Sequence, residues 1–313
     1  MRQGAIIAST VVIASGAAAA QSYPERVVQI IVPSTPGASA DILGRVLADG
    51  MSVQFRKPFI VVNKPGANGV LGTADVARAN ADGYTLFHGA TYSITVQPLT
   101  DKDAGYTLKS FTPICQTFKN DQLIVVPPNS PLKTARDLVE AAKQKPGVLN
   151  VGIPGVATIP HIAMIQFEQQ AKVEFNLVPF KGTAEEVQNT RSGQLDFAAV
   201  PLTVAAGSGL AIPGIFAEKR NPSIPDVPTF KEQGYDIAPL SVGGLLGPAG
   251  MPSDITQKLA SACIAIMKGE AAQRVVKTTF QPDGYFADAS GFARNLETDV
   301  AEKTPLVAKL NLK

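Results

Sequence analysis

The stretch with the clearest chemical potential is IIVPSTPGASADILGRVL, residues 30–47. It opens with an apolar run typical of a buried strand, turns through Pro36 and Gly37, and continues as an amphipathic helix pattern from near Asp41. A strand, a glycine-containing turn and a helix N-terminus present unpaired N–H groups and partial positive charge to an anion. The stretch therefore predicts an anion-binding loop. Asp41 itself is better explained as a helix cap or a partner of the helix dipole than as a catalytic residue.

Sequence patterns that build catalytic centres are missing from the rest of the chain. There is no G-x-S-x-G elbow and no G-x-x-x-x-G-K-[ST] loop, and GANGVLG at residues 66–72 matches a dinucleotide-binding loop only loosely. His161 opens a predicted helix after Pro160, where a structural hydrogen bond explains it better than ligand contact. With His88 as the other histidine and no C-x-x-C pair, a histidine-based metal site would be hard to assemble. We expect no catalytic residues, no metal and no cofactor.

The composition is that of a globular chain that does not bind nucleic acid. Apolar residues make up 45% and charged residues 17% of the 313 residues, which suffices for two domains with their own cores. The net charge is +2, both signs are interspersed, and no run of Lys or Arg forms the basic stripe of a nucleic-acid binder.

The N-terminal stretch MRQGAIIASTVVIASGAAAAQSYP has the form of a secretory signal peptide. Arg2 precedes an apolar core from Ala5 to Ile13, and small residues follow up to Ala20. The apolar core is too short for a comfortable membrane span, and no Cys follows the small residues, which argues against a lipoprotein anchor. Cleavage after Ala20 would make residues 1–20 the signal peptide and place the mature chain in the periplasm.

The chain has two cysteines, Cys115 and Cys263. Export makes a disulfide permissible, but two cysteines in a chain of this size need not pair. Cys115 falls in a strand pattern and Cys263 in a helix pattern. Both are more readily explained as buried, unpaired apolar residues, with a disulfide left open.

Short apolar strands alternate with helical patterns along most of the chain. Strands are expected at Val27–Val32, Phe59–Val62, Thr85–Phe87, Ile114–Phe118, Leu123–Val126, Asn150–Gly152, Leu177–Pro179, Phe197–Val200, Ile212–Ala217 and Val242–Leu246. Helices are expected at Asp41–Val53, Leu71–Ala79, Thr134–Gln144, Ile162–Gln170, Ala184–Ser192, Asp254–Lys268 and Gly291–Leu310, the last with a possible break at Pro305. Expected N-caps are Thr134 in a box with Asp137, Thr183 with Glu186 three residues on, and Ser253. The alternation predicts an α/β fold with two sheets and binding sites at the C-terminal ends of strands.

Several segments that follow one another along the chain resemble one family. They are YPERVVQIIVPSTPGASADILGRVLADGM, PFIVVNKPGANGVLGTADVARANADGYTLFHG, LVPFKGTAEEVQNTRSGQLDF and KRNPSIPDVPTFKEQGYDIAPLSVGGLLGPAGMP. In this order they resemble the extracytoplasmic substrate-binding proteins of tripartite tricarboxylate transporters, also called the Bug family. The resemblance covers residues 23–313, and NKPGANG, ADGYTL and PDVPT are its most specific phrases.

The resemblance implies a two-lobed, type II-like periplasmic binding protein in which each lobe is a mixed, mainly parallel sheet flanked by helices. Lobe 1 would comprise residues 22–120 and 240–313, and lobe 2 the insertion 121–239. The hinge would lie near Phe118–Gln122 and Ala238–Ser241. A small carboxylate would bind between the lobes, met by backbone amides, hydroxyls and ordered waters rather than by Arg.

The family's contact loops map onto five stretches of this sequence. In lobe 1, the P-x-P-P-G-G-S-x-D loop corresponds to residues 33–41 and a hydroxyl-rich loop to residues 89–93. In lobe 2, S-A-G-N-G-T-x-x-H corresponds to residues 153–161, VPYKG to 178–182 and F-D-N to 199–201. The ligand-binding residues that the resemblance implies are Ser34, Thr35, Gly37, Ala38, Ser39, Asp41, Ala90, Tyr92, Ser93, Gly155, Val156, Ala157, Thr158, His161, Phe180, Val200 and Pro201.

Departures from the family's pattern thin out the polar partners. Tyr92 puts a ring where glycine is common, Phe180 replaces Tyr, and Ile153 and Val156 replace polar residues. Val200 stands where the pattern has Asp, so this position cannot favour an ammonium group by ion pairing. We therefore expect a less polar carboxylate, aromatic or longer-chain, in preference to an amino acid or citrate. The alternative is that shifted loops or waters restore the lost contacts.

The function that the resemblance implies is transport without covalent chemistry. The protein would be a monomer that captures a carboxylate and hands it to the membrane permease subunits of the transporter. Two alternatives remain open. One is an exported α/β enzyme, such as a hydrolase or a lyase, that uses the same cleft, and the other is a binding protein that presents its ligand to a sensor kinase.

Overall fold

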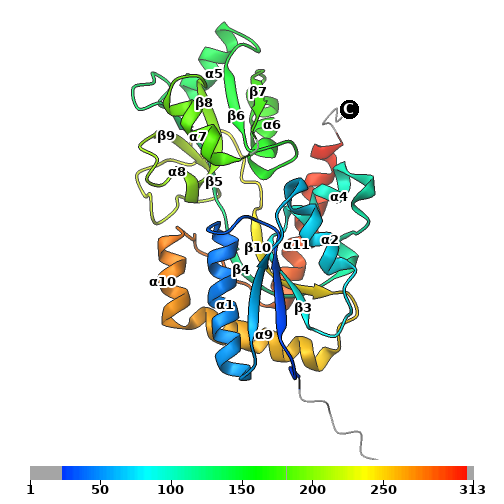
Figure 1. The fold of residues 1–313 in the computed structure, drawn as a ribbon. Helices are drawn as coiled ribbons and strands as arrows, with labels where there is room; N and C mark the ends of the chain where they lie inside the picture. The colour runs from blue at the N-terminus through cyan, green and yellow to red at the C-terminus, as the bar shows by residue number, and fades with distance from the viewer. Residues whose placement is uncertain (1–22, 181, 309–313) are drawn as a thin grey trace, which may run out of the picture.

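The computed structural model describes residues 23–180 and 182–308, which form two lobes, one above the other in Figure 1. Each lobe contains a five-stranded sheet with helices packed on it. The two-lobed α/β fold that the sequence predicts is therefore confirmed. The predicted signal peptide, residues 1–20, lies outside the described residues.

The first sheet has the strand order β2-β1-β3-β10-β4. Strand β1 (Val28–Val32) pairs in parallel with β2 (Phe59–Asn63) and β3 (Thr85–Ala90). Strand β10 (Val242–Pro248) runs antiparallel to both β3 and β4 (Phe111–Lys119). The sheet is thus mixed, with β10 as its one reversed strand.

The second sheet repeats this arrangement with the order β7-β6-β8-β5-β9. Strand β6 (Asn150–Ile153) is parallel to β7 (Asn176–Pro179) and β8 (Phe197–Pro201). Strand β5 (Gln122–Val126) is antiparallel to β8 and to β9 (Ala211–Phe216). Here β5 is the reversed strand.

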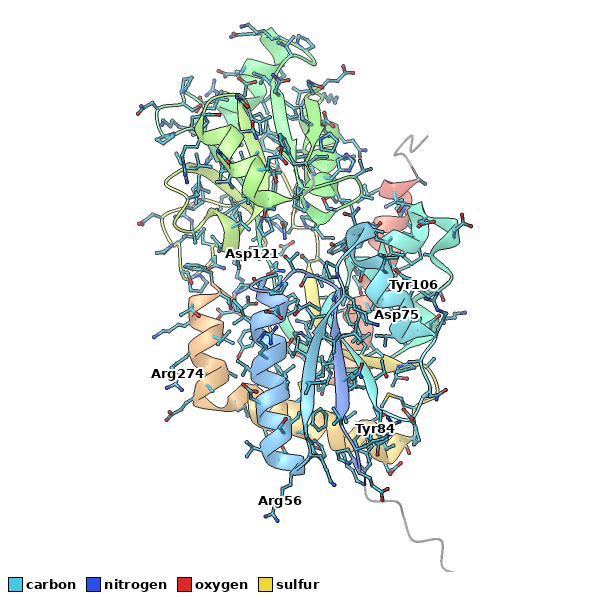
Figure 2. All side chains as sticks on the ribbon, viewed as in Figure 1. Arg56, Asp75, Tyr84, Tyr106, Asp121 and Arg274 are labelled. Atoms are coloured by element: carbon cyan, nitrogen blue, oxygen red, sulfur yellow. A yellow bond between two sulfur atoms is a disulfide. The ribbon has the colours of Figure 1, made fainter. Side chains whose placement is uncertain are left out.

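The chain crosses between the lobes twice, and each crossing leads into a reversed strand. The first crossing, Asn120–Asp121, joins β4 to β5. The second lies at the end of the segment 217–241, which joins β9 to β10, because Phe230 and Ile237 of that segment still pack in the core of the second lobe. The two crossings are hydrogen-bonded to each other, because the Asn120 N–H donates to the Ser241 carbonyl at 2.8 Å. Asp121, labelled in Figure 2, lies between the two lobes.

Helices flank both sheets. In the first lobe they are α1 (Ser39–Phe55), α2 (Val70–Ala77), α3 (Tyr92–Thr95), α4 (Gln97–Thr100), α9 (Ser253–Lys268), α10 (Glu270–Thr278), α11 (Ala289–Val307) and the 3-10 turns η1 (Ala67–Gly69), η2 (Lys102–Ala104) and η3 (Leu108–Ser110). In the second lobe they are α5 (Ala135–Gln144), α6 (Ile159–Ala171), α7 (Thr183–Arg191) and α8 (Leu202–Ala205). No helix in the described ranges is both long and apolar enough to span a membrane.

Adjacent residues of β1 are buried in different cores. Ile30 belongs to a cluster with Leu43 of α1 and Leu259 of α9, whereas Ile31 belongs to one with Phe292 of α11. Successive side chains of a strand point to opposite faces of a sheet. A strand covered on both faces therefore needs a continuous apolar run, which the residues before Pro33 supply.

The helix boundaries confirm some predictions and correct others. The capping box of Thr134 and Asp137 is present at the start of α5. The predicted caps Thr183 and Ser253 are wrong, because each is the first residue of its helix and Gly182 and Pro252 precede them without a side-chain cap. The break considered at Pro305 is absent, since α11 continues to Val307. Helix α10 was not predicted at all.

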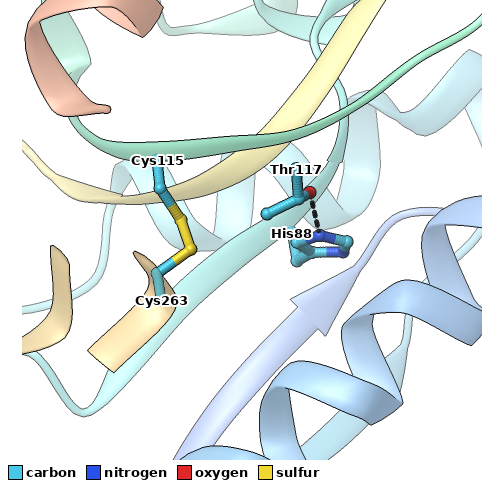
Figure 3. Close-up of a disulfide and its surroundings, with 4 residues drawn as sticks. All are labelled: His88, Cys115, Thr117 and Cys263. Atoms are coloured by element: carbon cyan, nitrogen blue, oxygen red, sulfur yellow. Dashed lines mark hydrogen bonds between the residues drawn. A yellow bond between two sulfur atoms is a disulfide. The ribbon is translucent and has the colours of Figure 1, made fainter. Parts of the chain in front are cut away.

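Cys115 of β4 and Cys263 of α9 form a disulfide, with their Cα atoms 6.6 Å apart (Figure 3). Both residues are fully buried, as predicted. The unpaired state that the sequence favoured is wrong. The residues are 148 positions apart in sequence, and only the packing of α9 against the first sheet brings them within bonding distance.

His88 has a structural role beside this disulfide (Figure 3). Its Nδ1 lies 2.9 Å from the Ala40 carbonyl and its Nε2 lies 2.8 Å from the Thr117 hydroxyl. Because a carbonyl only accepts, Nδ1 carries the proton and Nε2 accepts from Thr117. Burial lowers the pKa of His88 to about 4, so the ring is neutral at neutral pH. His88 thereby fixes the first turn of α1 against β3 and β4.

Candidate functional site

A cleft of about 560 Å³ lies between the lobes. The first lobe contributes Pro33, Ser34, Thr35, Pro36, Gly37, Ala38, Ser39, Ala40, Ile42, Gly69, Gly89, Ala90, Tyr92, Ser93, Phe118, Thr278 and Thr279. The second lobe and the first crossing contribute Asn120, Thr183, Pro201, Thr203 and Val204. Every one of these side chains is uncharged, so the described part of the cleft wall offers dipoles and hydroxyls but no ion.

The loop between β1 and α1 forms one wall and is held in shape by a carboxylate behind it. Asp41 is 3% exposed, and its Oδ2 accepts a hydrogen bond from the Gly37 N–H at 2.9 Å. Arg45 donates to both oxygens of Asp41, and Asn63 donates to Oδ1 and to the Ser34 carbonyl. Burial alone would raise the pKa of Asp41, but these donors outweigh it and hold the pKa below its usual value.

The N-terminus of α1 opens onto this wall. Its N-cap is Ala38, whose methyl group cannot accept a hydrogen bond. The N–H groups of the first turn therefore face the cleft without a side-chain acceptor. The Gly37 backbone has φ +87°, the left-handed conformation in which glycine is unstrained. Ser34 Oγ is buried with no hydrogen-bond partner in the described chain. This wall therefore offers a ligand the positive end of a helix dipole, the N–H groups of α1 and the unpartnered hydroxyl of Ser34.

The second wall of the first lobe follows β3. Ser93 Oγ accepts a hydrogen bond from Thr73 Oγ1 at 2.9 Å and donates to the Ala90 carbonyl at 3.3 Å. The Tyr106 hydroxyl donates to the Ser93 carbonyl at 2.6 Å. Tyr92 is half-buried at the edge of the cleft, and burial raises its pKa. Hydrogen bonds thus join Ser93 of this wall to Thr73 and Tyr106, and Tyr92 adds an aromatic ring to the cleft.

Nine of the residues expected to bind ligand line this cleft. They are Ser34, Thr35, Gly37, Ala38, Ser39, Ala90, Tyr92, Ser93 and Pro201. Asp41 lies behind the wall, and Val200, one residue before Pro201, is fully buried in the second sheet. Phe180 is half-buried and is not part of the cleft wall.

The remaining expected residues, in the loop 155–161, lie at the contact between the lobes rather than in the cleft wall. Gly155 is half-buried and Val156 is 39% exposed, whereas Ala157, Thr158 and His161 are buried. A Cβ placed on Gly155 would lie 3.4 Å from Asn68 Oδ1 of the first lobe. Ala157 packs in one apolar cluster with Val96 and Val307. Ligand contact by this loop stays a prediction.

His161 closes the same loop on itself. Its Nδ1 accepts a hydrogen bond from the Ala157 N–H at 2.9 Å, so the proton of the neutral ring sits on Nε2. Burial lowers the pKa of His161 to about 4. The Thr158 hydroxyl donates to the Gly155 carbonyl at 2.8 Å. The hydrogen bond from Ala157 gives His161 a structural role, as the sequence favoured.

Several cleft residues were missed by the sequence analysis. Asn120 is in the first crossing, and its Oδ1 is buried without a partner among the described residues. Thr203 follows β8, while Thr278 and Thr279 end α10. The amphipathic spacing of Ala272, Val275 and Val276 is the sequence signal for α10. A helix predicted from it would have placed Thr278 and Thr279 at its C-terminal end.

The chain matches a family model described as the tripartite tricarboxylate transporter family receptor over residues 43–312. A Cupriavidus necator protein, named as a UPF0065 protein in the gbd 5' region, is 33% identical over 299 residues. The match covers 94% of this chain and 90% of the relative.

Two solved structures have the same fold. One, described as a periplasmic transporter, matches with a TM-score of 0.80 at 30% identity and covers 93% of this chain and 99% of that chain. The other is Rpa4515 of R. palustris with adipate, with a TM-score of 0.81 at 24% identity, covering 91% of this chain and 97% of that chain.

Proposed function

The chain belongs to the tripartite tricarboxylate transporter receptor family, and from this premise we propose that it captures a small carboxylate between its lobes and delivers it to the membrane subunits of such a transporter. It is a solute-binding protein, and the family to which it belongs consists of receptors rather than enzymes.

The observation that carries the proposal is the neutral, donor-rich lining of the cleft. The uncapped N-terminus of α1 presents N–H groups and a partial positive charge, and Ser34 adds a hydroxyl without a partner. A carboxylate is an acceptor with about four lone-pair sites, so it complements these donors. Because an arginine ion pair is absent from the described wall, release needs only a set of neutral hydrogen bonds to break.

The apolar part of the lining supports a less polar acid. Tyr92, Phe118, Ile42 and Val204 line the cleft, and the buried Val200 leaves this position without a group to pair with an ammonium. We propose an aromatic or longer-chain carboxylate as the preferred ligand class. Adipate, the acid named with the R. palustris structure, is of that kind.

The same proposal includes the organisation of the mature protein. Lobe 1 is taken as residues 22–120 with 240–313 and lobe 2 as 121–239, limits that fall at the two crossings between the sheets. Removal of residues 1–20, a periplasmic location and a monomeric state belong to the proposal.

An exported hydrolase or lyase that uses the same cleft is the less favoured alternative. The described lining has hydroxyls but no His, Asp, Glu, Lys or Cys side chain that would activate one of them. No group of three His, Cys, Asp or Glu side chains is placed to hold a metal ion within residues 23–180 and 182–308. A binding protein that signals to a sensor kinase would use the same contacts and differ only in its partner.

Thermal unfolding with a panel of acids tests the proposal. Adipate, malate, citrate, aspartate and benzoate would each be added to protein purified without refolding, after native mass spectrometry has identified any co-purified ligand. At least one acid is expected to raise Tm in proportion to the logarithm of its concentration, with adipate or benzoate above citrate and aspartate. No shift with any acid would reject carboxylate binding, and a new product after prolonged incubation would favour the enzyme.

A further inference from the structure

One carboxyl group of the second lobe is buried without any hydrogen-bond partner. Glu186 of α7 is 0% exposed, and neither of its carboxyl oxygens has a partner in the described part of the chain. Burial raises the pKa of Glu186 to about 9, so the group is a neutral carboxylic acid at neutral pH. In that form it has one O–H to donate and lone pairs to accept. A buried polar group of this kind is costly unless something hydrogen-bonds it.

Glu186 lies one helical turn behind the second-lobe wall of the cleft. Thr183, the first residue of α7, lines the cleft, and so does Pro201 at the end of β8. The Cγ of Glu186 covers Gly152 near the C-terminal end of β6, because a Cβ placed on Gly152 would lie 2.7 Å from it. The absence of a side chain at Gly152 is thus what leaves room for Glu186.

The direction of the side chain follows from helix geometry. Side chains on an α-helix lean toward its N-terminus, and the N-terminus of α7 is the end that borders the cleft. The carboxyl group does not cap this helix, since its oxygens are unpartnered and the N-cap is Gly182. Glu186 does not itself line the cleft in this structure, so its unpartnered carboxyl group lies behind the part of the wall that Thr183 forms.

We propose that Glu186 is a specificity-determining residue of the second lobe, which donates a hydrogen bond toward the cleft, to the bound acid or to the water that bridges to it. This inference rests on the proposed carboxylate-binding function. A neutral donor suits an anionic ligand, whereas an ionised carboxylate in the same place would repel it. The dry surroundings that keep the proton on Glu186 are therefore what make an acidic residue compatible with an anion site.

Two substitutions of matched length separate the hydrogen bond from the packing. The probe is whichever of adipate, malate, citrate, aspartate and benzoate stabilises the wild type most, and its affinity is measured by titration calorimetry. Glu186→Gln keeps a donor and an acceptor and is expected to bind within about threefold of the wild type. Glu186→Met keeps the length without a hydrogen bond and is expected to bind about tenfold more weakly, while folding at least as stably.

Thr190→Val is the control for disturbance of α7. Thr190 is fully buried on the same helix, and its hydroxyl donates to the Glu186 carbonyl at 2.9 Å. This variant is expected to lose stability but keep its affinity for the probe. Equal affinity of wild type and Glu186→Met would overturn the inference, as would an equal loss of affinity in Glu186→Met and Thr190→Val. If no acid binds the wild type, the proposed function itself fails.

An infrared measurement keeps the inference testable if Glu186→Met does not fold. The carbonyl stretch of a protonated carboxyl is assigned to Glu186 by its disappearance in Glu186→Gln. The band is expected to shift when the probe binds to the wild type, because the hydrogen bond of that carboxyl changes. A band that stays in place at saturating probe would overturn the inference.

Discussion

At the residue scale, Asp41 shows how a side chain can control a binding wall without touching the cleft. It accepts hydrogen bonds from Gly37, Arg45 and Asn63, and these fix the loop that leads into α1. The sequence favoured a cap or a dipole partner over a catalytic group. The structure makes Asp41 a positioning residue, because its bond to Gly37 bends the loop so that the helix N-terminus faces the cleft.

Replacing Asp41 by Asn should weaken both the fold and the binding of the preferred acid. An amide offers one acceptor oxygen and cannot serve Gly37, Arg45 and Asn63 together. We expect a loss of about 1–3 kcal/mol in unfolding free energy by urea denaturation, and a measurable loss of affinity. Asp75→Asn is the control, since Asp75 pairs with Lys64 at a half-exposed site and should change neither much. Identical behaviour of the two variants would contradict the role given to Asp41.

Glu186 should make the protein less stable as pH rises. The unfolded carboxyl loses its proton near pH 4.5 and the folded one near 9, so between these values the folded state binds more protons than the unfolded state. Unfolding free energy therefore falls with pH in this window, by at most about 1.4 kcal/mol per pH unit from this group. Urea denaturation from pH 5 to 8 should show a shallower fall in Glu186→Gln than in the wild type. Parallel curves would show that Glu186 is ionised or solvated in the folded protein.

At the element scale, helix α11 fastens the second crossing to the first lobe through a buried ion pair. Lys303 and Asp299 are 2% and 1% exposed and contact each other. Lys303 Nζ also donates to the Leu240 carbonyl at 2.5 Å, and Thr95 Oγ1 of α3 donates to Asp299 Oδ2 at 2.5 Å. One pair of charges thus joins α11, the crossing and the short helix that carries Tyr92.

Removing one member of this pair should lower the unfolding free energy much more than removing both. Lys303→Met leaves Asp299 as an uncompensated buried charge and is expected to cost about 3–5 kcal/mol in unfolding free energy. Adding Asp299→Leu should recover a large part of that loss. Guanidinium denaturation of the single and the double variant checks this, and a double variant as unstable as the single one would speak against a coupled pair.

Periodicity revealed most elements, while features set by long-range contacts escaped it. The apolar run before Pro33 and the spacing after Asp41 predicted β1 and α1, because both faces of the strand and one face of the helix are buried. Helix α10 is amphipathic, but it has only nine residues and follows α9 directly after Gly269, so its pattern is easily overlooked, and Thr278 and Thr279 of the cleft were missed with it. The disulfide could not be predicted either, since it depends on tertiary distance.

At the scale of the whole molecule, the lobes meet in an apolar contact as well as at the crossings. Ile162 of α6 packs with Val96 and Val307 of the first lobe, and all three are buried. The loop 155–161, in which the sequence predicted ligand contacts, lies in this contact. In this structure the lobes are therefore held together partly by side chains that do not line the cleft.

Ile162→Ala should separate the lobes. The change is expected to cost about 2–5 kcal/mol in stability and to raise the radius of gyration of the ligand-free protein in small-angle scattering. Met164→Ala is the matched control, because Met164 lies on the same helix but packs inside the second lobe. It should lose similar stability with an unchanged scattering curve. Equal scattering from both variants would mean that the apolar contact does not set the lobe spacing.

Strand β10 pairs with strands that precede it in the chain by a whole lobe, which has a consequence for biosynthesis. Strand β4 has β10 as its single neighbour in the sheet, and β10 leaves the ribosome only after all of the second sheet. The inserted lobe holds its five strands in one unbroken stretch, so it can mature while its host is still incomplete. Failure of an isolated 121–239 fragment to fold would contradict this order. Once the second lobe has folded, the connection between β4 and β10 behaves as a much shorter loop. The entropy cost of bringing β10 against β4 to complete the first lobe is then smaller.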